Sequence, residues 1–364
     1  MKELLREKYD ANLGIKLKMY QTEKGIQYGA IPDLYRPVSP KSFELPIYAH
    51  VCITDMCNLK CPYCYAADGN KIQGNMDFEK IESLINLFDK NGVFSVTWTG
   101  GEPFCHPDLY KIIRLTHSKC MIQTVLTNGT MIPSGFFEES PKTGILYQFS
   151  LNEAWSENSK DKENHYIVYH NISECNRNHI DNILTILLEP FCESRIESLF
   201  KELVENGIRK VRMSYKMPVG KCSSESFDEY FKSLIKSIPL YKKVYEKYKD
   251  IIFVYFQCDC IPADNRIIPV RFEMCEAGTT LIYIDNNGDV FPCPLFKSVQ
   301  ELKCGNVFDD DWRKLWNSAP MEELRSVISC ENCESKCLGW CRAIKFFSTN
   351  VISGPGKACH KLIP

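Results

Sequence analysis

The sequence predicts an α/β protein: a partial (β/α)6 barrel, like an incomplete TIM barrel, followed by a small cysteine-rich domain. From about residue 45 to 220, apolar runs of strand length alternate six times with amphipathic helical patterns. Strands that alternate with helices indicate a parallel sheet with helices outside it. The last hundred residues lose this alternation and become dense in cysteine, which indicates a second, different domain.

Six apolar runs are the predicted strands of the barrel. They span residues 47–54, 93–98, 121–126, 146–151, 183–188 and 210–215. The clearest helix lies between a capping Asp77 and a terminating Gly92, where apolar residues recur at i, i+3, i+4 and i+7 from Ile81. The same pattern recurs from Ile196 and from Phe227. Six strand and helix units therefore predict a partial barrel.

The chain divides into three predicted parts, an N-terminal extension (1–45), the barrel (46–265) and the cysteine-rich domain (266–364). The extension contains several prolines and little periodicity, and we expect it to lie on the barrel. Residues 153–179 are polar and poorly periodic, which predicts an irregular crossover or a mobile loop. In the last part, Asn286-Asn287-Gly288-Asp289 predicts a hairpin turn, and residues 312–316 predict a short helix.

Bulk properties exclude several classes of protein. The 364 residues carry a formal charge of −2, which gives no sign of a nucleic-acid partner. No apolar stretch approaches the roughly 20 residues of a membrane span. The charged N-terminus has no signal sequence, so we expect a cytoplasmic protein in a reducing compartment. Nineteen clustered cysteines in such a chain favour metal binding over disulfides.

Three cysteines follow the first predicted strand in the segment Cys57-Asn58-Leu59-Lys60-Cys61-Pro62-Tyr63-Cys64. A structural zinc site and a [4Fe–4S] cluster each take four protein ligands. Three thiolates on one loop therefore leave one iron open to a substrate or cofactor. A second motif, Trp98-Thr99-Gly100-Gly101-Glu102-Pro103, follows the second predicted strand. Both motifs thus come at strand C-terminal ends, where function gathers in such barrels.

These two motifs, in this order, resemble those of radical S-adenosylmethionine (SAM) enzymes. The resemblance implies that Cys57, Cys61 and Cys64 hold a [4Fe–4S] cluster whose fourth iron is chelated by the methionine part of SAM. It also implies the remaining SAM contacts. These are the methionine amino group with Gly100, Gly101, Glu102 and Pro103, the adenine near Tyr63, and the ribose and carboxylate near Ser150 and Asn152. The segment after the sixth strand would pass the adenine.

The C-terminal cysteines resemble those of a SPASM domain, which carries two auxiliary iron–sulfur clusters, expected here to be [4Fe–4S]. The resemblance assigns Cys275, Cys293 and Cys341 to auxiliary cluster I, and Cys330, Cys333, Cys337 and Cys359 to auxiliary cluster II. Two features depart from the family: three residues instead of five separate Cys333 from Cys337, and an eighth cysteine is missing. Cluster I thus lacks one thiolate, which Cys304, a small molecule or a substrate group would supply. The alternative for the Cys330–Cys341 run is a zinc knuckle.

The resemblance implies an enzyme that reductively cleaves SAM to a 5′-deoxyadenosyl radical and abstracts hydrogen from a substrate. Most SPASM enzymes act on ribosomally made peptides or protein side chains, by cross-linking, epimerisation or oxidation. We therefore expect a peptide or protein substrate and a flavodoxin- or ferredoxin-type reductant. Forty-five residues cannot hold a leader-binding domain of about 80–90 residues, so a separate protein or the barrel itself would bind a leader. The alternatives are a small-molecule substrate (a sugar, aminocyclitol or tetrapyrrole) and a non-enzymatic iron–sulfur or zinc protein.

Overall fold

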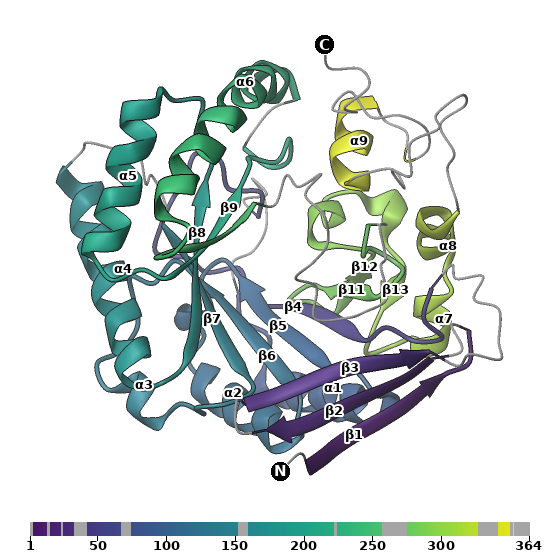
Figure 1. Cartoon of the computed structure of the whole chain (residues 1–364). Coiled ribbons are helices and arrows are strands. Elements are labelled where there is room, and N and C mark those ends of the chain that lie inside the picture. The colour runs from purple at the N-terminus through teal and green to yellow at the C-terminus, as the bar shows by residue number, and fades with distance from the viewer. Residues whose placement is uncertain are drawn as a thin grey trace.

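The computed structural model describes residues 3–12, 15–22, 25–32, 42–66, 74–151, 159–221, 224–256, 275–326, 341–349 and 352 (Figure 1). Its strands form a three-stranded sheet in the order β1-β2-β3 and a ten-stranded sheet in the order β10-β9-β8-β7-β6-β5-β4-β11-β12-β13. The strands are β1 (Glu3–Asp10), β2 (Ile15–Thr22), β3 (Gly25–Pro32), β4 (Tyr48–Thr54), β5 (Ser95–Gly100), β6 (Ile122–Thr127), β7 (Ile145–Leu151), β8 (Asp181–Leu187), β9 (Lys210–Ser214), β10 (Phe253–Phe256), β11 (Leu281–Ile284), β12 (Asp289–Phe291) and β13 (Gly305–Asn306). The helices are α1 (Phe78–Asn91), α2 (Leu109–Ser118), α3 (Phe136–Glu139), α4 (Ser159–Arg177), α5 (Glu193–Glu205), α6 (Ser224–Tyr248), α7 (Trp312–Trp316), α8 (Ala319–Arg325) and α9 (Arg342–Thr349), with the 3-10 turns η1 (Pro103–Cys105), η2 (Pro294–Phe296) and η3 (Gln300–Leu302).

The six predicted barrel strands are confirmed as β4 to β9, and each boundary lies within two residues of its predicted place. All five of their pairings are parallel. A further parallel strand, β10, extends the sheet beyond β9 and was not predicted. Helix α1 ends as expected at Gly92, which adopts the left-handed conformation at φ 71°. Asp77 does occupy the N-cap, but its side chain makes no capping hydrogen bond.

The two faces of the barrel sheet differ in character. Alternate side chains on β4 to β9 are buried and most of them are apolar. Val51, Trp98 and Phe149 illustrate this and belong to one continuous core, whereas Gln123 and Thr127 on β6 are buried polar exceptions. Helices α1 to α5 cover this side of the sheet (Figure 1). Residues between them in sequence, such as His50 and Thr97, are only half-buried and more often polar. The helix-free face therefore carries polar side chains that can contact a ligand.

The prediction of an irregular segment at residues 153–179 is wrong for residues 159–177, which form α4. Its buried side chains include Val168, Ile172 and Cys175, which share one helix face with His165 and Tyr169. Polar and aromatic residues at these positions weaken the apolar period, and the hydrophobic pattern alone did not reveal the helix. The helix is instead stabilised by tertiary packing of α4 against β7 and β8.

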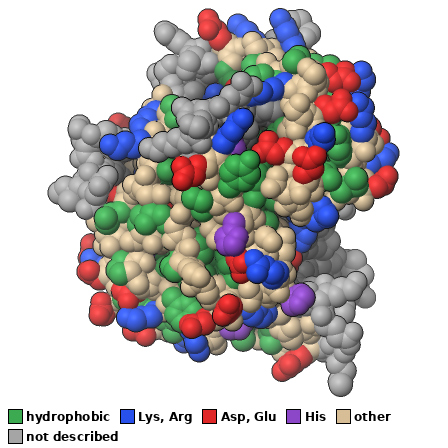
Figure 2. Space-filling model, turned by 90° about the vertical axis from the view of Figure 1, so that its left-hand side faces the viewer, with side chains coloured by type: hydrophobic (Ala, Val, Ile, Leu, Met, Phe, Trp, Pro, Cys, Tyr) green, Lys and Arg blue, Asp and Glu red, His purple; other side chains and the backbone are tan. Residues whose placement is uncertain are grey.

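The outer helices carry mixed charges. Figure 2 shows the side of the molecule on which α3, α4 and α5 lie, where acidic and basic side chains alternate without a large patch of one sign. Exposed ion pairs join α5 to α6, namely Glu193 with Lys243 at 2.7 Å and Glu197 with Lys247 at 3.0 Å. In the part of the chain that the structure describes, no helix is both long and apolar enough to span a membrane.

The cysteine-rich part continues the barrel sheet. Strand β11 lies parallel to β4, on the side of β4 opposite β5, and forms the predicted hairpin with β12. The turn places Gly288 at φ 90°. The predicted short helix is α7, with the expected bounds. The predicted domain boundary between residues 265 and 266 lies outside the described residues and stays a prediction.

The N-terminal extension forms the sheet β1-β2-β3, which the sequence analysis did not predict. Ile15, Leu17 and Met19 alternate along β2 and pack on Ile47 and Phe94, which precede β4 and β5. The Arg6 guanidinium donates to the carbonyls of residues 93 and 119, also before barrel strands. The extension therefore covers the N-terminal edge of the barrel, opposite the edge where both motifs lie.

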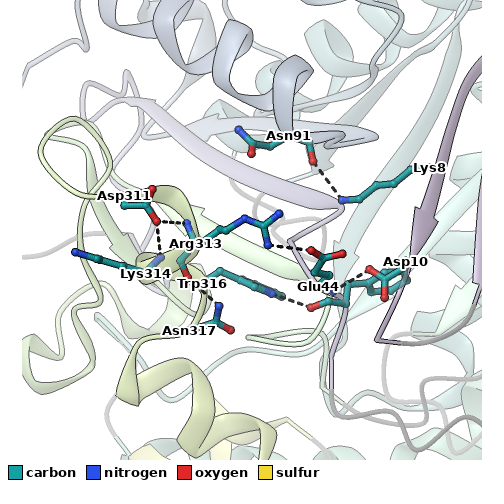
Figure 3. A network of polar contacts seen from close by, with 10 residues as sticks. Lys8, Asp10, Glu44, Asn91, Asp311, Arg313, Lys314, Trp316 and Asn317 are labelled. Atoms are coloured by element: carbon teal, nitrogen blue, oxygen red, sulfur yellow. Dashed lines mark hydrogen bonds and ion pairs between the residues drawn. The ribbon is translucent and has the colours of Figure 1, made fainter.

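A polar network joins the extension, the barrel and α7 (Figure 3). Its centre is the segment before β4, where the Glu44 backbone N–H donates to Asp10 and the Glu44 carboxylate pairs with Arg313 at 2.9 Å. The buried Trp316 indole N–H donates to the Phe43 carbonyl at 2.9 Å. The N-terminal sheet thus packs against the N-terminal edge of the barrel strands and does not cover the C-terminal edge, where both motifs lie.

Candidate functional site

The three motif cysteines lie on the loop that follows β4. Cys57 is exposed, Cys61 and Cys64 are half-buried, and all three are free thiols. The Leu59 backbone N–H donates to the Cys57 sulfur at 3.4 Å. Burial raises the pKa of the Cys57 thiol, and this hydrogen bond opposes the shift. Within the described residues, no three His, Cys, Asp or Glu side chains converge to hold one metal ion. A [4Fe–4S] cluster binds each thiolate to a different iron, so free thiols spread along one loop fit it.

The Gly100-Gly101-Glu102 segment lies against the start of the cysteine loop. Gly101 N–H donates to the Thr54 carbonyl at 2.7 Å, and Glu102 N–H donates to the Met56 carbonyl at 2.8 Å. A Cβ atom on Gly101 would stand 2.3 Å from the Met56 carbonyl oxygen, closer than real Cβ contacts come. Glycine is therefore needed here for close approach of the two backbones. The two sequence motifs meet directly, as expected for neighbouring parallel strands.

Glu102 is a buried junction between this segment and the turn after β6. Its side chain is 1% exposed and accepts three hydrogen bonds, from Phe104 N–H at 3.1 Å, the Thr127 hydroxyl at 2.8 Å and Asn128 N–H at 2.7 Å. Burial raises the pKa of Glu102 to about 6, although these hydrogen bonds oppose the shift. Pro103, also buried, begins the short turn η1. The sequence analysis did not predict this structural role of Glu102.

Two asparagines tie the site loops together and were missed. The Asn128 side-chain amide donates to the Asn58 side-chain oxygen at 2.8 Å, and the Asn58 amide donates to the Thr130 hydroxyl at 2.8 Å. Asn58 lies between the first two motif cysteines, so the turn after β6 holds the cysteine loop from the side. An asparagine inside a ligand loop was the available signal, because its amide can both donate and accept.

The segment after β9 holds the other end of the cysteine loop. Lys221 N–H donates to the Cys64 carbonyl at 3.3 Å. The Lys216 ammonium lies 6.0 Å from the centre of the half-buried Tyr63 ring and pairs with Glu189 at 2.5 Å. The sixth barrel strand therefore reaches the motif at the residue that the resemblance places near adenine.

Gly220 makes the contact with Cys64 possible. It adopts φ +70°, and a Cβ there would stand 2.4 Å from the Cys64 carbonyl oxygen. We expect Gly220→Ala to displace the cysteine loop and to lower the rate of SAM cleavage at least about tenfold. A left-handed alanine also costs roughly 1–2 kcal/mol of conformational free energy, which is a separate effect. The measurement is 5′-deoxyadenosine formed per cluster.

The matched control for this prediction is Gly135→Ala. Gly135 has φ +77° but nothing within 4 Å of an added Cβ, so alanine there suffers the same backbone strain without the clash. Equal losses in the two variants would mean that backbone strain, and not contact with the cysteine loop, explains the effect. Full activity of Gly220→Ala would show that the loop tolerates the displacement.

The remaining predicted SAM contacts are only partly described. Ser150, half-buried, lies one residue before the end of β7 on the helix-free face of the sheet. Asn152 lies outside the described residues. Both assignments stay predictions.

The cysteines assigned to auxiliary cluster I lie near one another. Cys293 belongs to a buried apolar cluster, against which the half-buried Cys275 and Cys341 both pack. Burial raises the pKa of Cys293 well above its usual value, and the neighbouring Cys275 and Cys341 raise it further. The buried Arg342 opposes this trend, because its backbone N–H and its charge lower the pKa of Cys275. Three thiols beside a buried positive charge fit an iron–sulfur cluster.

Cys304 is the remaining candidate ligand. Its thiol is close to the Leu302 carbonyl, the Ser318 hydroxyl and the charge of Arg325, and burial raises its pKa to about 11. Cys304 packs against the barrel core, as Cys341 also does. The identity of the fourth ligand of cluster I stays a prediction. The four cysteines assigned to cluster II, Cys330, Cys333, Cys337 and Cys359, lie outside the described residues.

The cysteine loop also contacts the C-terminal part. The Lys297 ammonium donates to the Ala66 carbonyl at 2.7 Å. Burial raises the pKa of Tyr65 to about 12, and both Cys64 and Cys293 contribute to this shift. Tyr65 is therefore close enough to one cysteine of each set to respond to its charge.

Family models match both parts of this chain. The family model of the radical SAM superfamily matches residues 51–188, and that of the SPASM iron–sulfur cluster-binding domain matches residues 275–338. Together the two matches cover more than half of the chain.

Relatives match over most of their length. The antilisterial bacteriocin subtilosin biosynthesis protein AlbA of Bacillus subtilis is 24% identical over 85% of this chain and 68% of its own. The mycofactocin maturase MftC of Mycobacterium ulcerans is 23% identical over 88% of this chain and 90% of its own. The crystal structure of Streptococcus suis SuiB bound to S-adenosylmethionine matches with a TM-score of 0.68 at 20% identity, covering 88% of this chain and 78% of that one. The likeness to SuiB confirms the fold.

Proposed function

We propose that this chain, which belongs to the radical SAM superfamily and carries a C-terminal SPASM domain, modifies a ribosomally made peptide by radical chemistry. The observation that carries the proposal is the direct contact between the cysteine loop and the Gly100–Glu102 segment. Their backbones are joined by hydrogen bonds of 2.7 and 2.8 Å at the C-terminal edge of the sheet. This arrangement brings the ligands of a cluster next to the groups expected to bind SAM.

The chain's own residues would position the reactants. Cys57, Cys61 and Cys64 would hold a [4Fe–4S] cluster, with Gly100, Gly101, Glu102 and Pro103 beside it to orient the methionine part of SAM. A cluster held by these cysteines would supply the electron for the reductive cleavage of SAM. Such homolytic chemistry belongs to cofactors, and the protein contributes binding and orientation.

The peptide substrate is proposed from the relatives. AlbA and MftC, named for bacteriocin biosynthesis and mycofactocin maturation, match this chain over 85% and 88% of its length. SuiB has also been crystallised with its precursor peptide SuiA. We propose cross-linking, epimerisation or oxidation of a peptide side chain as the reaction. A flavodoxin- or ferredoxin-type protein would supply electrons, and a separate protein or the barrel would bind a leader.

A reducing compartment such as the cytoplasm suits this activity. All twelve cysteines in the described part of the chain are free thiols, and thiols that must bind iron cannot be held in disulfides.

Mass spectrometry of short peptides encoded beside the gene tests the proposal. With reduced enzyme and SAM, we expect a cross-linked or oxidised product to lose two hydrogen atoms. Epimerisation in deuterated water would instead add one deuterium. Enzyme without SAM and enzyme with Cys57, Cys61 and Cys64 replaced by alanine are the controls. SAM cleavage without any change in the peptides would contradict the peptide proposal and favour a small-molecule substrate.

A further inference from the structure

A row of polar side chains crosses four neighbouring strands on the helix-free face of the barrel sheet. Ser150 on β7 is paired in register with Thr185 on β8, Thr185 with Arg212 on β9, and Arg212 with Tyr255 on β10. Residues paired in register project from the same face of a sheet. The residues that flank Arg212, Val211 and Met213, are fully buried on the helix side, so the row lies on the opposite face.

Two hydrogen-bond donors at the centre of this row have no partner. The Thr185 hydroxyl and the Arg212 Nε–H are both buried and make no hydrogen bond. A buried polar group without a partner costs folding free energy comparable to a lost hydrogen bond. Since a guanidinium only donates and a hydroxyl can donate, an acceptor placed beside both would relieve the cost.

The charge of Arg212 also lacks compensation in the described part of the chain. Within that part, the Arg212 guanidinium donates one long hydrogen bond to the Gln148 side-chain oxygen, at 3.4 Å, and lies 5.9 Å from the centre of the Tyr255 ring. None of the ion pairs between described residues includes Arg212. His50 on β4 lies within its field, and burial together with Arg212 lowers the pKa of His50 to about 4. His50 is therefore neutral near pH 7, and Arg212 is the uncompensated charge on this face.

We propose that Arg212, assisted by Thr185, binds a carboxylate of the peptide substrate, either an acidic side chain or the C-terminus. The proposal rests on the proposed function and deepens it. A guanidinium presents a planar pair of donors that matches a carboxylate, and the resulting hydrogen bonds are charge-assisted. The single long hydrogen bond that Arg212 donates to Gln148 is weak enough to be replaced by a bond to such a ligand.

The position of Arg212 suits a substrate anchor. Arg212 lies two residues before Ser214, the last residue of β9, and so about 7 Å from the edge that bears the motifs. A peptide residue held there would leave its neighbours near that edge, where hydrogen is abstracted. The carboxylate of SAM is a second group that could pair with a guanidinium. It is expected at Ser150, two strands away and about 10 Å from Arg212.

Equilibrium dialysis on the anaerobic holoenzyme tests the proposal with a radiolabelled probe, N-acetylglutamate α-amide, and its neutral glutamine counterpart. We expect wild-type protein to prefer the charged probe. Arg212→Gln should weaken that probe about ten- to a hundredfold, Arg212→Lys less, and Thr185→Val a few-fold. SAM affinity, measured in parallel, should stay within about threefold in every variant. The control is Lys210→Gln, which removes a charge from the same strand, where it pairs with Asp181 at 2.8 Å.

Two results would overturn the proposal, provided that Arg212→Gln keeps its iron and its circular dichroism spectrum. Loss of SAM affinity without loss of the charged probe would assign Arg212 to the carboxylate of SAM. Unchanged binding of both ligands would make Arg212 a structural residue. Probe binding does not require turnover, so the two proposals can fail separately. If the protein preferred the charged probe through Arg212 but modified no peptide, only the proposal of a peptide substrate would be contradicted.

Discussion

Replacing Cys57, Cys61 and Cys64 together by alanine is expected to reduce 5′-deoxyadenosine formation to background. The three thiolates are the proposed ligands of the cluster that reduces SAM, and no other described cysteine lies on their loop. Iron bound by the C-terminal cysteines should remain, because those thiols belong to a separate buried cluster around Cys293. The measurements are the yield of 5′-deoxyadenosine under reducing conditions, the iron content and the electron paramagnetic resonance spectrum.

The control for this variant removes Cys120 and Cys192 instead. Cys192 is exposed, as Cys57 is, and Cys120 is half-buried, as Cys61 and Cys64 are, so the control also removes accessible thiols. It should cleave SAM at the wild-type rate. If the variant without Cys57, Cys61 and Cys64 still produced 5′-deoxyadenosine, the assignment of the SAM-binding cluster would be wrong.

Glu102→Gln is expected to weaken SAM binding by roughly one to two decades, because a charge-assisted hydrogen bond to an ammonium contributes about 1.5–3 kcal/mol. In the structure, Oε1 accepts two hydrogen bonds and Oε2 accepts one, from Asn128, which leaves Oε2 able to accept another. The side-chain amide of glutamine cannot accept that bond through its nitrogen. Calorimetry with SAM on the anaerobic protein measures the loss.

The raised pKa of Glu102 predicts the pH dependence of the same interaction. Because burial raises it from 4.5 to about 6, the carboxylate is ionised above about pH 6 and protonated below. An ammonium binds the ionised form, so SAM affinity should fall about tenfold between about pH 7.5 and pH 5. Glu102→Gln should abolish this dependence. Thr127→Val, which removes one bond to Glu102 and keeps its charge, should retain it.

A pH-independent affinity in the wild-type protein, or a Glu102→Gln variant with unchanged affinity, would contradict the role of Glu102 in binding SAM. Glu102 would then serve only to join the turn after β6 to the Gly100–Glu102 segment.

Strong local periodicity explains which parts of the fold were predictable. Strands β4 to β9 carry mostly apolar residues at alternate positions, because their helix-covered face must be buried, and the helices at Ile81, Ile196 and Phe227 repeat a clear apolar face. Helix α4 was predicted wrongly, since its buried face includes His165 and Tyr169. Strand β10 was missed as well. Its residues Phe253 to Phe256 form a short apolar run, in which Val254 is buried and Phe253 and Tyr255 are exposed.

The sequence by itself determined the cysteine spacing, the Gly-Gly-Glu-Pro segment and their order after successive strands, because ligand chemistry and strand ends are local properties. Only the tertiary structure decided which backbones touch. It joined Gly101 to Thr54, placed Lys221 against Cys64 and made Glu102 the buried partner of Asn128. It also aligned Thr185 with Arg212 on two neighbouring strands. Such pairings depend on sheet register and chain packing, which bring together residues that are distant in sequence and carry no local signal of one another.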